Sequence, residues 1–447
     1  MKNAISARSV AADVLLRVDR DQAFASAALD AEIVRSPQLE ARDRALATEL
    51  AYGSLRVRRW LESRLQRHAT RPLEKLDPRV RVHLVLATFQ LFFLERVPKF
   101  AAVSEAVSAV RAVNGPKVAA FANAILRKLA REAEEEAGKL DLETIAVESA
   151  PPWLFASLAD SLSEVGARAY LRAALTAPPN GICVYAASKR DAWLARLREA
   201  APQGDFEAGA LSPHAIRVRA AGRPHDLPGY AEGAWTLQEE GSQVIALALG
   251  ARAGDIVLDA CAGRGNKTAL LASAVGAGAV DAADLHPSKL ARLREELTRL
   301  ARAPRSTYAV DWSVGAGAVE GRYHRILVDA PCSGTGTLGR RPDLYLRRAP
   351  EDLARLSALQ VAIVARTADL LEPGGRLVYA VCSVLREEGE QVVEKILAAR
   401  PDLELGPFEG QPAADLAKCE SMLRLLPHVH GTDGYFLASL VKRPVTC

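Results

Sequence analysis

The chain of 447 residues is long enough for two or three domains, because a single domain commonly holds about 150 residues. Its composition, with 49% hydrophobic, 25% charged and 5% aromatic residues, excludes a disordered or fibrous protein. The net charge of +4 is unevenly spread, since residues 1–131 carry 23 Lys and Arg against 13 Asp and Glu and the remainder is acidic. A basic segment of this kind indicates a polyanionic partner such as nucleic acid.

Two further features limit where the protein works and what it holds. No apolar run approaches the ~18 residues that a membrane span requires, and charges interrupt the N-terminal segment where a signal peptide would be apolar. The sequence therefore predicts a cytoplasmic protein with no membrane partner. The six cysteines lie far apart and form no zinc-type cluster, so neither a disulfide framework nor a bound metal is expected.

The first part of the chain has a helical pattern. Apolar residues recur at helical spacing, for example Val10, Val14 and Val18, and proline-containing turn signals divide the pattern into helices of ordinary length. We therefore expect an all-α domain over 1–140. A mixed α+β connector is expected over 141–240, where a Pro-Pro-Asn stretch precedes a strand-like ICVYA.

From residue 241 onward, short apolar runs alternate with amphipathic helical patterns. This alternation is typical of βαβ units and predicts a mostly parallel, doubly wound α/β Rossmann-like domain over 241–447. The predicted parallel strands are 255–260, 279–285, 306–310, 324–331 and 375–383. The final apolar runs, 423–427 and 435–442, flank the sequence HGTDG and predict an antiparallel hairpin that reverses the last strand.

The first predicted strand leads into the loop DACAGRGNKT, which begins at Asp259 and precedes a helix. Its glycines permit a tight turn, and a helix N-terminus offers N–H groups to an anionic group. Cys261 and Asn266 occupy the glycine positions of a Walker P-loop, and the third glycine of a dinucleotide fingerprint is missing. The remaining interpretation is a site for S-adenosylmethionine, in which Asp284 binds the ribose hydroxyls and Asp311 contacts the adenine edge.

Two cysteines, Cys332 and Cys382, lie at the ends of the fourth and fifth predicted strands, at the edge where a cofactor would bind. C5 of a pyrimidine is a poor nucleophile, so its methylation requires attack of a thiolate at C6. A second thiol is well placed to help release that adduct. Asp329 can hydrogen-bond the base and stabilise the developing charge, and Lys267 can favour a thiolate.

These motifs resemble those of the bacterial RNA 5-methylcytosine methyltransferases of the Fmu/Sun type. The similarity rests on DAPCSGTGTLGRRPDLYLRR, LVYAVCSVLREEGEQV and LLPHVHGTDGYFLASL, in this order along the chain. RALATELAYGSLR, FQLFFLERVPKFAAVSEAV and FANAILRKL, nearer the N-terminus, resemble the NusB-like RNA-binding domain of this subfamily. The resemblance implies a NusB-like domain followed by a methyltransferase domain whose final strand is reversed.

The resemblance also implies roles for individual residues. Cys382 would be the nucleophile and Cys332 would release the product, with Asp329 and Lys267 beside them. The residues implied to bind S-adenosylmethionine or the target base are Cys261, Ala262, Gly263, Arg264, Gly265, Asn266, Lys267, Asp284, Asp311 and Asp329. The family loop usually reads CAAPGGKT, so Gly263, Arg264 and Asn266 depart from it.

The implied substrate is RNA, in particular 16S ribosomal RNA, naked or in an early assembly particle, and the protein is expected to act as a monomer. The basic residues that we expect to contact phosphates are Arg56, Arg58, Arg59, Lys99, Arg127 and Lys128. Two alternatives stay open: a non-catalytic RNA-binding or ribosome-assembly factor on the same fold, and a paralogue that methylates another RNA. DNA methylation is disfavoured, because DNA enzymes of this chemistry use a single cysteine in a Pro-Cys motif.

Overall fold

The computed structural model describes residues 5–444, which divide into two compact units. The helical unit comprises the chain up to Ala177 together with Leu338–Arg348, and the sheet unit comprises Pro178–Thr337 and the chain from Ala349 onward. The segment 141–240, expected as a connector, is thus divided between the two units after Ala177. None of the helices in the described part of the chain is long and apolar enough to cross a membrane.

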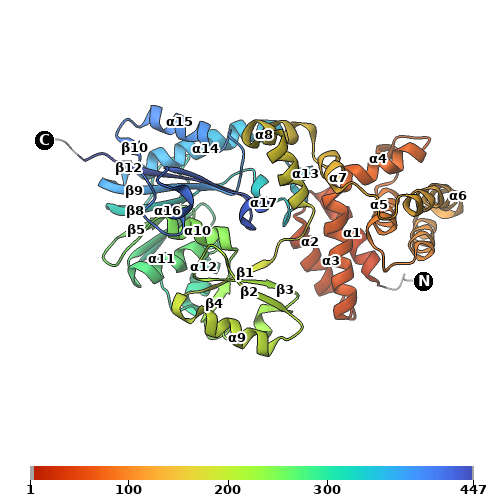
Figure 1. Ribbon diagram of the computed structural model, residues 1–447, viewed down its shortest axis with the longest axis horizontal. Helices are drawn as coiled ribbons and strands as arrows, with labels where there is room; N and C mark the ends of the chain where they lie inside the picture. The colour runs from red at the N-terminus through yellow and green to blue at the C-terminus, as the bar shows by residue number, and fades with distance from the viewer. Residues whose placement is uncertain (1–4, 445–447) are drawn as a thin grey trace. The chain divides into compact units, whose positions relative to one another are not determined.

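The helical unit confirms the all-α expectation (Figure 1). Its long helices are α1 (Ala7–Asp21), α2 (Ala25–Arg35), α3 (Ala41–Arg56), α4 (Arg58–His68), α5 (Pro78–Phe93), α6 (Lys99–Glu135), α7 (Leu142–Ser149) and α8 (Pro152–Ala174). The apolar residues that repeat at helical spacing in α1 are buried in the core of this unit. α6 is interrupted at Gly115, which has a φ of 78°, just before Pro116.

A short segment of the C-terminal half, Leu338–Arg348, belongs to the helical unit, and we call it the arm. It contains the single-turn helix α13 (Leu344–Arg347). Arg56 of α3 donates a hydrogen bond from Nη2 to the carbonyl of Gly339 at 2.9 Å. The guanidinium of Arg347 lies over the ring of Phe24, 4.0 Å from its centroid. The chain therefore returns to the helical unit immediately after the segment that carries Cys332.

The sheet unit begins with a small antiparallel sheet in the order β2-β3-β1-β4. Its strands are β1 (Asn180–Val184), β2 (Asp205–Ala208), β3 (Ala215–Arg219) and β4 (Trp235–Leu237). The helix α9 (Arg190–Ala200) packs on one face through Leu194 and Leu197, which share a core with Phe206. We call this part the connector sheet.

The main sheet has the order β10-β12-β9-β8-β5-β6-β7, and β11 pairs with β12. Its strands are β5 (Val257–Asp259), β6 (Val280–Asp284), β7 (Ser306–Ala309), β8 (Tyr323–Asp329), β9 (Leu371–Val381), β10 (Leu403–Leu405), β11 (Met422–Leu425) and β12 (Tyr435–Lys442). β5 to β9 are parallel, and β12 runs antiparallel to both β9 and β11. The sheet is therefore mostly parallel with a reversed final strand, as the sequence predicted.

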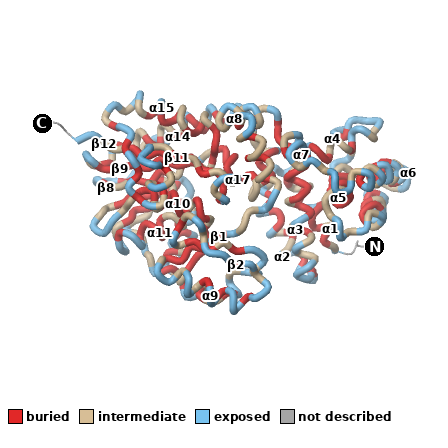
Figure 2. Tube along the Cα trace, in the orientation of Figure 1, coloured by how far each residue is buried: buried red, intermediate tan, exposed pale blue. Residues whose placement is uncertain are grey.

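Helices cover both faces of the main sheet. They are α10 (Glu240–Ala248), α11 (Asn266–Val275), α12 (Pro287–Arg299), α14 (Pro350–Asp369), α15 (Glu390–Ala399) and α16 (Ala413–Ala417), while α17 (Pro427–His430) is a single turn between β11 and β12. Neighbouring residues of one strand enter different cores: Val257 packs with α10 to α12, and Leu258 with α14 and α15. Figure 2 shows this burial along the strands, with exposed residues on the outer helices. Because helices cover both faces of the sheet, a ligand can reach it only at the ends of the strands.

Candidate active site

The carboxyl edge of the parallel strands gathers the side chains that the sequence singled out. Asp259 ends β5, Asp284 ends β6, Asp329 ends β8, and Cys382 directly follows β9. The strand order reverses between β5 and β8, with β6 and β7 on one side and β9 on the other. In open α/β sheets, ligands bind at the carboxyl ends of the strands beside such a reversal.

The loop after β5 enters α11 through two glycines in the left-handed region. Gly263 has a φ of 57° and Gly265 a φ of 89°. A Cβ at Gly265 would lie 2.8 Å from Cγ of Leu293, whereas a Cβ at Gly263 would meet no atom within 4 Å. Gly265 thus lets the loop pack on α12, and Gly263 leaves its backbone open to a ligand.

The positions at which this loop departs from the resembled pattern are accommodated locally. Asn266 is the first residue of α11, and its Nδ2 donates to the carbonyl of Leu237 at 2.8 Å. The side chain of Arg264 is exposed. The asparagine therefore adds a contact between the loop and the end of β4.

Asp284 supports the loop from the neighbouring strand. Its Oδ2 accepts a hydrogen bond from the N–H of Gly263 at 3.1 Å, and Nζ of Lys289 lies 3.5 Å from its Oδ1. Because each carboxylate oxygen has two lone pairs, Asp284 can accept further hydrogen bonds. Asp311, beyond the end of β7, is exposed, and hydrogen bonds from the hydroxyl and N–H of Ser313 lower its pKa.

Asp259 is the most deeply buried carboxylate beside the loop. Its Oδ2 accepts a hydrogen bond from Oγ1 of Thr268 at 2.7 Å, while its Oδ1 has no hydrogen-bond partner among the described residues. Burial raises the pKa of Asp259 to about 6. A buried acceptor without a partner at the base of the loop is a place where a ligand donor can bind.

Lys267 and Asp329 form a close ion pair with 2.6 Å between Nζ and Oδ2. Burial alone lowers the pKa of Lys267, but the charge and hydrogen bond of Asp329 outweigh it and raise that pKa above its ordinary value. The lysine is therefore an ammonium that fixes the carboxylate of Asp329 in place at the end of β8.

The two cysteines meet beside this ion pair. The Sγ atoms of Cys332 and Cys382 lie 3.1 Å apart, and both residues are half-buried. The hydrogen bond to Cys382, reinforced by burial, raises the pKa of the Cys332 thiol well above its ordinary value. Cys332 thus keeps its proton at neutral pH and can donate a hydrogen bond to the neighbouring sulfur.

Backbone hydrogen bonds hold the loops around the two thiols. The N–H of Gly336 donates to the carbonyl of Cys382 at 3.0 Å, and the N–H of Gly434 donates to the carbonyl of Gly336 at 2.7 Å. A Cβ at Gly336 would lie 1.9 Å from the carbonyl oxygen of Gly434. Only glycine lets the three segments approach this closely.

Sequence reasoning missed two hydrogen-bonded carboxylates near the site, of which Glu239 is half-buried and Glu388 is fully buried. Glu239, the N-cap of α10, accepts hydrogen bonds from the N–H of Asp433 and the hydroxyl of Tyr435. Glu388 accepts hydrogen bonds from the N–H of Ser333. Both glutamates lie in short acidic stretches, QEEGS and REEGE, and those stretches give no signal that one acid is buried.

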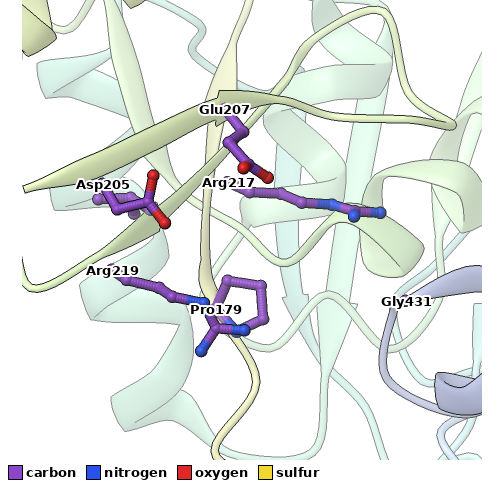
Figure 3. A pocket seen from close by; sticks show the side chains of 7 residues that line it. Pro179, Asp205, Glu207, Arg217, Arg219 and Gly431 are labelled. Atoms are coloured by element: carbon purple, nitrogen blue, oxygen red, sulfur yellow. The ribbon is translucent and has the colours of Figure 1, made fainter.

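The connector sheet contains a small polar cavity of about 170 Å³ (Figure 3). Its charged lining comes from β2 and β3, with Asp205, Glu207, Arg217 and Arg219, and Gly431 also borders it. Arg217 donates from Nε to Glu240 at 2.7 Å and from Nη2 to the carbonyl of His430 at 3.3 Å. The cavity therefore adjoins the loop that leads to Gly434.

The expected phosphate contacts divide into buried and accessible residues. Arg58 is buried and ion-paired with Asp19 and Glu62, and Arg56 is buried against the arm. Both guanidinium groups are thus committed to internal partners. The accessible candidates are Arg59, Arg127 and Lys128, which are exposed, and Lys99, which is partly exposed.

The comparisons with known proteins agree with this geometry. The family model described as 16S rRNA methyltransferase RsmB/F matches residues 246–441, and the NusB family model matches residues 5–131. The crystal structure of PH0851 shares the fold, with a TM-score of 0.79 and 22% identity over 99% of this chain and 100% of that chain. Fold and site together define a methyltransferase with an N-terminal NusB-type domain.

Two curated relatives place the chain more closely. The probable ribosomal RNA small subunit methyltransferase B of Bacillus subtilis (strain 168) is 31% identical over 98% of this chain and 99% of its own length. The ribosomal RNA small subunit methyltransferase B of Klebsiella pneumoniae (strain 342) is 32% identical over 99% of this chain and 100% of its own. The chain belongs to the RsmB/F family of 16S rRNA methyltransferases.

The raised pKa of Asp259 predicts a pH-dependent stability. A folded-state pKa of about 6 exceeds the ordinary value of 3.8, so the stability that Asp259 gains from its proton is fully present below pH 3.8 and is lost as pH rises through 6. Without cofactor, the free energy of unfolding should fall by about 1 kcal/mol more between pH 5 and 7 in wild type than in Asp259→Asn. Urea unfolding at both pH values measures the difference, and parallel curves would contradict the assignment.

Proposed function

We propose that the protein methylates C5 of a cytosine in RNA, with S-adenosylmethionine as methyl donor and a covalent adduct between Cys382 and C6 of the base. The observation that carries this proposal is the pair of thiols, with 3.1 Å between Cys332 Sγ and Cys382 Sγ, at the ligand-binding edge of a methyltransferase sheet. A single thiol suffices to form the adduct, whereas a second thiol in contact with it serves the adduct's release.

The chain's own residues account for bond formation and release. The Cys382 thiolate attacks C6, and the electron pair moved to C5 makes that carbon able to take the methyl group. Solvent then takes the C5 proton, the pair of the C5–H bond restores the C5–C6 double bond, and the C6–S bond breaks with its electron pair returning to Cys382. The protonated Cys332, held in hydrogen-bond contact, stabilises the departing thiolate.

Asp329 and Lys267 orient the base in this proposal. A carboxylate at the end of β8 can accept a hydrogen bond from the amino group at C4 of cytosine, and Lys267 prevents the carboxylate from turning away. The ion pair is formed without substrate, so no reorganisation is needed when charge develops on the base. The base reaches this site only after leaving its stack, which favours an unpaired target in RNA.

The residues at the loop after β5 fit S-adenosylmethionine, which supplies an electrophilic methyl group when bound. That cofactor carries an ammonium group and two ribose hydroxyls, all hydrogen-bond donors. Asp259 offers an unpartnered buried oxygen, Asp284 retains lone pairs, and Gly263 leaves the backbone open. We infer that the loop 261–267 with Asp284 holds the cofactor and that Asp311 meets its adenine edge.

The substrate of this chain is inferred to be 16S ribosomal RNA, naked or in an early assembly particle. The full-length relatives are named for the small ribosomal subunit, and the basic NusB-type domain supplies surface cations. Phosphates attract such cations regardless of sequence, so this domain contributes affinity while the methyltransferase domain selects the base.

The cysteine assignments predict three different outcomes with labelled S-adenosylmethionine and unmodified 16S transcript. Wild type should incorporate methyl groups, Cys382→Ala should incorporate none above background, and Cys332→Ala should accumulate a gel-stable protein–RNA adduct. Cys419→Ala is the matched control, because Cys419 is an exposed free cysteine, and this variant should behave as wild type.

Other results of that experiment separate the alternatives. Absence of incorporation on 16S transcript, ribosomal particles and total RNA, together with absence of cofactor binding by calorimetry, would leave a non-catalytic RNA-binding or assembly factor. Incorporation into total RNA alone would indicate a paralogue with another target. Incorporation of methyl groups into DNA in preference to RNA would show that RNA is not the substrate.

The accessible cations predict a change in salt dependence. Replacing both Arg127 and Lys128 with Gln removes two phosphate contacts, so the slope of log K against log salt should become less negative by about 1 to 2. Binding titrations from low to moderate salt measure this slope, and methyl transfer at saturating RNA should persist. Arg292→Gln, at an exposed position of α12, should leave the slope unchanged. An unchanged slope for the double variant would show that Arg127 and Lys128 do not contact the phosphates of the RNA.

A further inference from the structure

Glu388 occupies an unusual place for a carboxylate. It lies in the turn between Cys382 and α15, and its residue is 0% exposed. Its Oε1 accepts hydrogen bonds from the N–H of Ser333 at 2.8 Å and from Nε2 of Gln360 at 3.0 Å, and its Oε2 accepts one from the hydroxyl of Ser333. Three donors therefore converge on one buried anion.

These donors surround Cys332 on both sides. Ser333 is the residue that follows it, and Nε2 of Gln360 also donates to the carbonyl of Pro331, the residue before it, at 3.0 Å. The hydroxyl of Tyr379 in β9 lies 2.6 Å from the carbonyl oxygen of Glu388. Glu388 thus joins the backbone around Cys332 to β9, the strand that Cys382 directly follows.

A second set of contacts ties the same loop to the other cysteine. Oγ1 of Thr335 lies 2.9 Å from Oγ of Ser383, and both residues are almost fully buried. The N–H of Gly336 donates to the carbonyl of Cys382. With Glu388 fixing Ser333 and Thr335 meeting Ser383, the residues after both cysteines belong to one buried polar network.

We propose that Glu388 is a positioning residue that holds Cys332 against Cys382 for release of the methylated base. It touches neither the base nor the cofactor site, and it acts through Ser333 and Gln360. The proposal deepens the proposed function and rests on it for the release step. The placement of the two sulfur atoms, however, can be measured without RNA.

The chemical reason lies in what an amide would do at this position. The carboxylate offers only acceptors to the donors of Ser333 and Gln360. In Glu388→Gln, the NH₂ group can meet Oγ of Ser333 only as a donor, so that hydrogen bond must reverse, and the two hydrogen bonds to the remaining oxygen lose the strength that the charge gave them. The loop that carries Cys332 then relaxes while Cys382, at the end of β9, keeps its place.

The first measurement uses free protein and diamide. Two thiols lose two electrons and two protons to form a disulfide, and the diazene is reduced to a hydrazine. The rate of Cys332–Cys382 disulfide formation, read by mass spectrometry of the linked peptides, reports how often the sulfurs meet. We expect Glu388→Gln to slow it about tenfold relative to wild type, because a misplacement of order 1 Å has effects of at least this size.

The second measurement follows methyl transfer to RNA. Glu388→Gln should keep a first-turnover burst close to that of wild type, lose about tenfold in steady-state turnover and accumulate the protein–RNA adduct. A merely structural role would lower the burst and the steady state together. Glu394→Gln, the same substitution at an exposed position of α15, should match wild type in both measurements.

Each remaining outcome decides the matter. The proposal would be overturned if Glu388→Gln formed the disulfide and turned over at the same rates as wild type. It would also be overturned if Cys332 and Cys382 formed no disulfide in the wild-type protein. If wild type methylates no RNA, the proposed function is wrong. The rates of disulfide formation then test by themselves whether Glu388 positions Cys332 against Cys382. If Glu388→Gln fails to fold by circular dichroism, Ser333→Ala, which removes one of the three donors, takes its place with the same expectation.

Discussion

The candidate active site depends on a ladder of backbone hydrogen bonds that continues past the ends of the strands. Beyond the last pair of β8 and β9, the N–H of Ala330 donates to the carbonyl of Ala380 and that of Gly336 to the carbonyl of Cys382. Gly434 then donates to Gly336 on the other side. Because buried backbone groups must be paired, these bonds leave the cysteine loops a single arrangement. The thiols meet as a consequence of sheet pairing.

The carboxylates of the site differ in environment and so in chemical character. Asp259 is buried with one oxygen unpartnered, and burial raises its pKa. Asp329 is paired with an ammonium, and Glu388 is surrounded by neutral donors. The sequence alone does not distinguish these three acidic residues. Their different hydrogen-bond and charge partners, which the fold supplies, give the three carboxylates different chemical properties.

Sequence patterns predicted the parts of this structure that depend on local periodicity. The strands that end at Asp259, Asp284 and Asp329 are apolar runs, and the reversed hairpin follows from two such runs around a short glycine-containing loop. Features set by distant partners were missed. Arg58 looks like a surface cation until Asp19 is found beside it, and nothing in REEGE separates Glu388 from its acidic neighbours.

Because of the arm, the helical unit and the sheet unit cannot be exchanged independently of each other. Leu344 and Tyr345 of the arm are buried, yet their cover comes from the helical unit, which precedes them by some hundreds of residues in the sequence. A fragment that begins after α8 would carry these apolar side chains without their cover, beside the loop of Cys332. Genetic exchange of the N-terminal domain for another RNA-binding domain would therefore require the arm to change with it, so the two are expected to evolve as one inherited block.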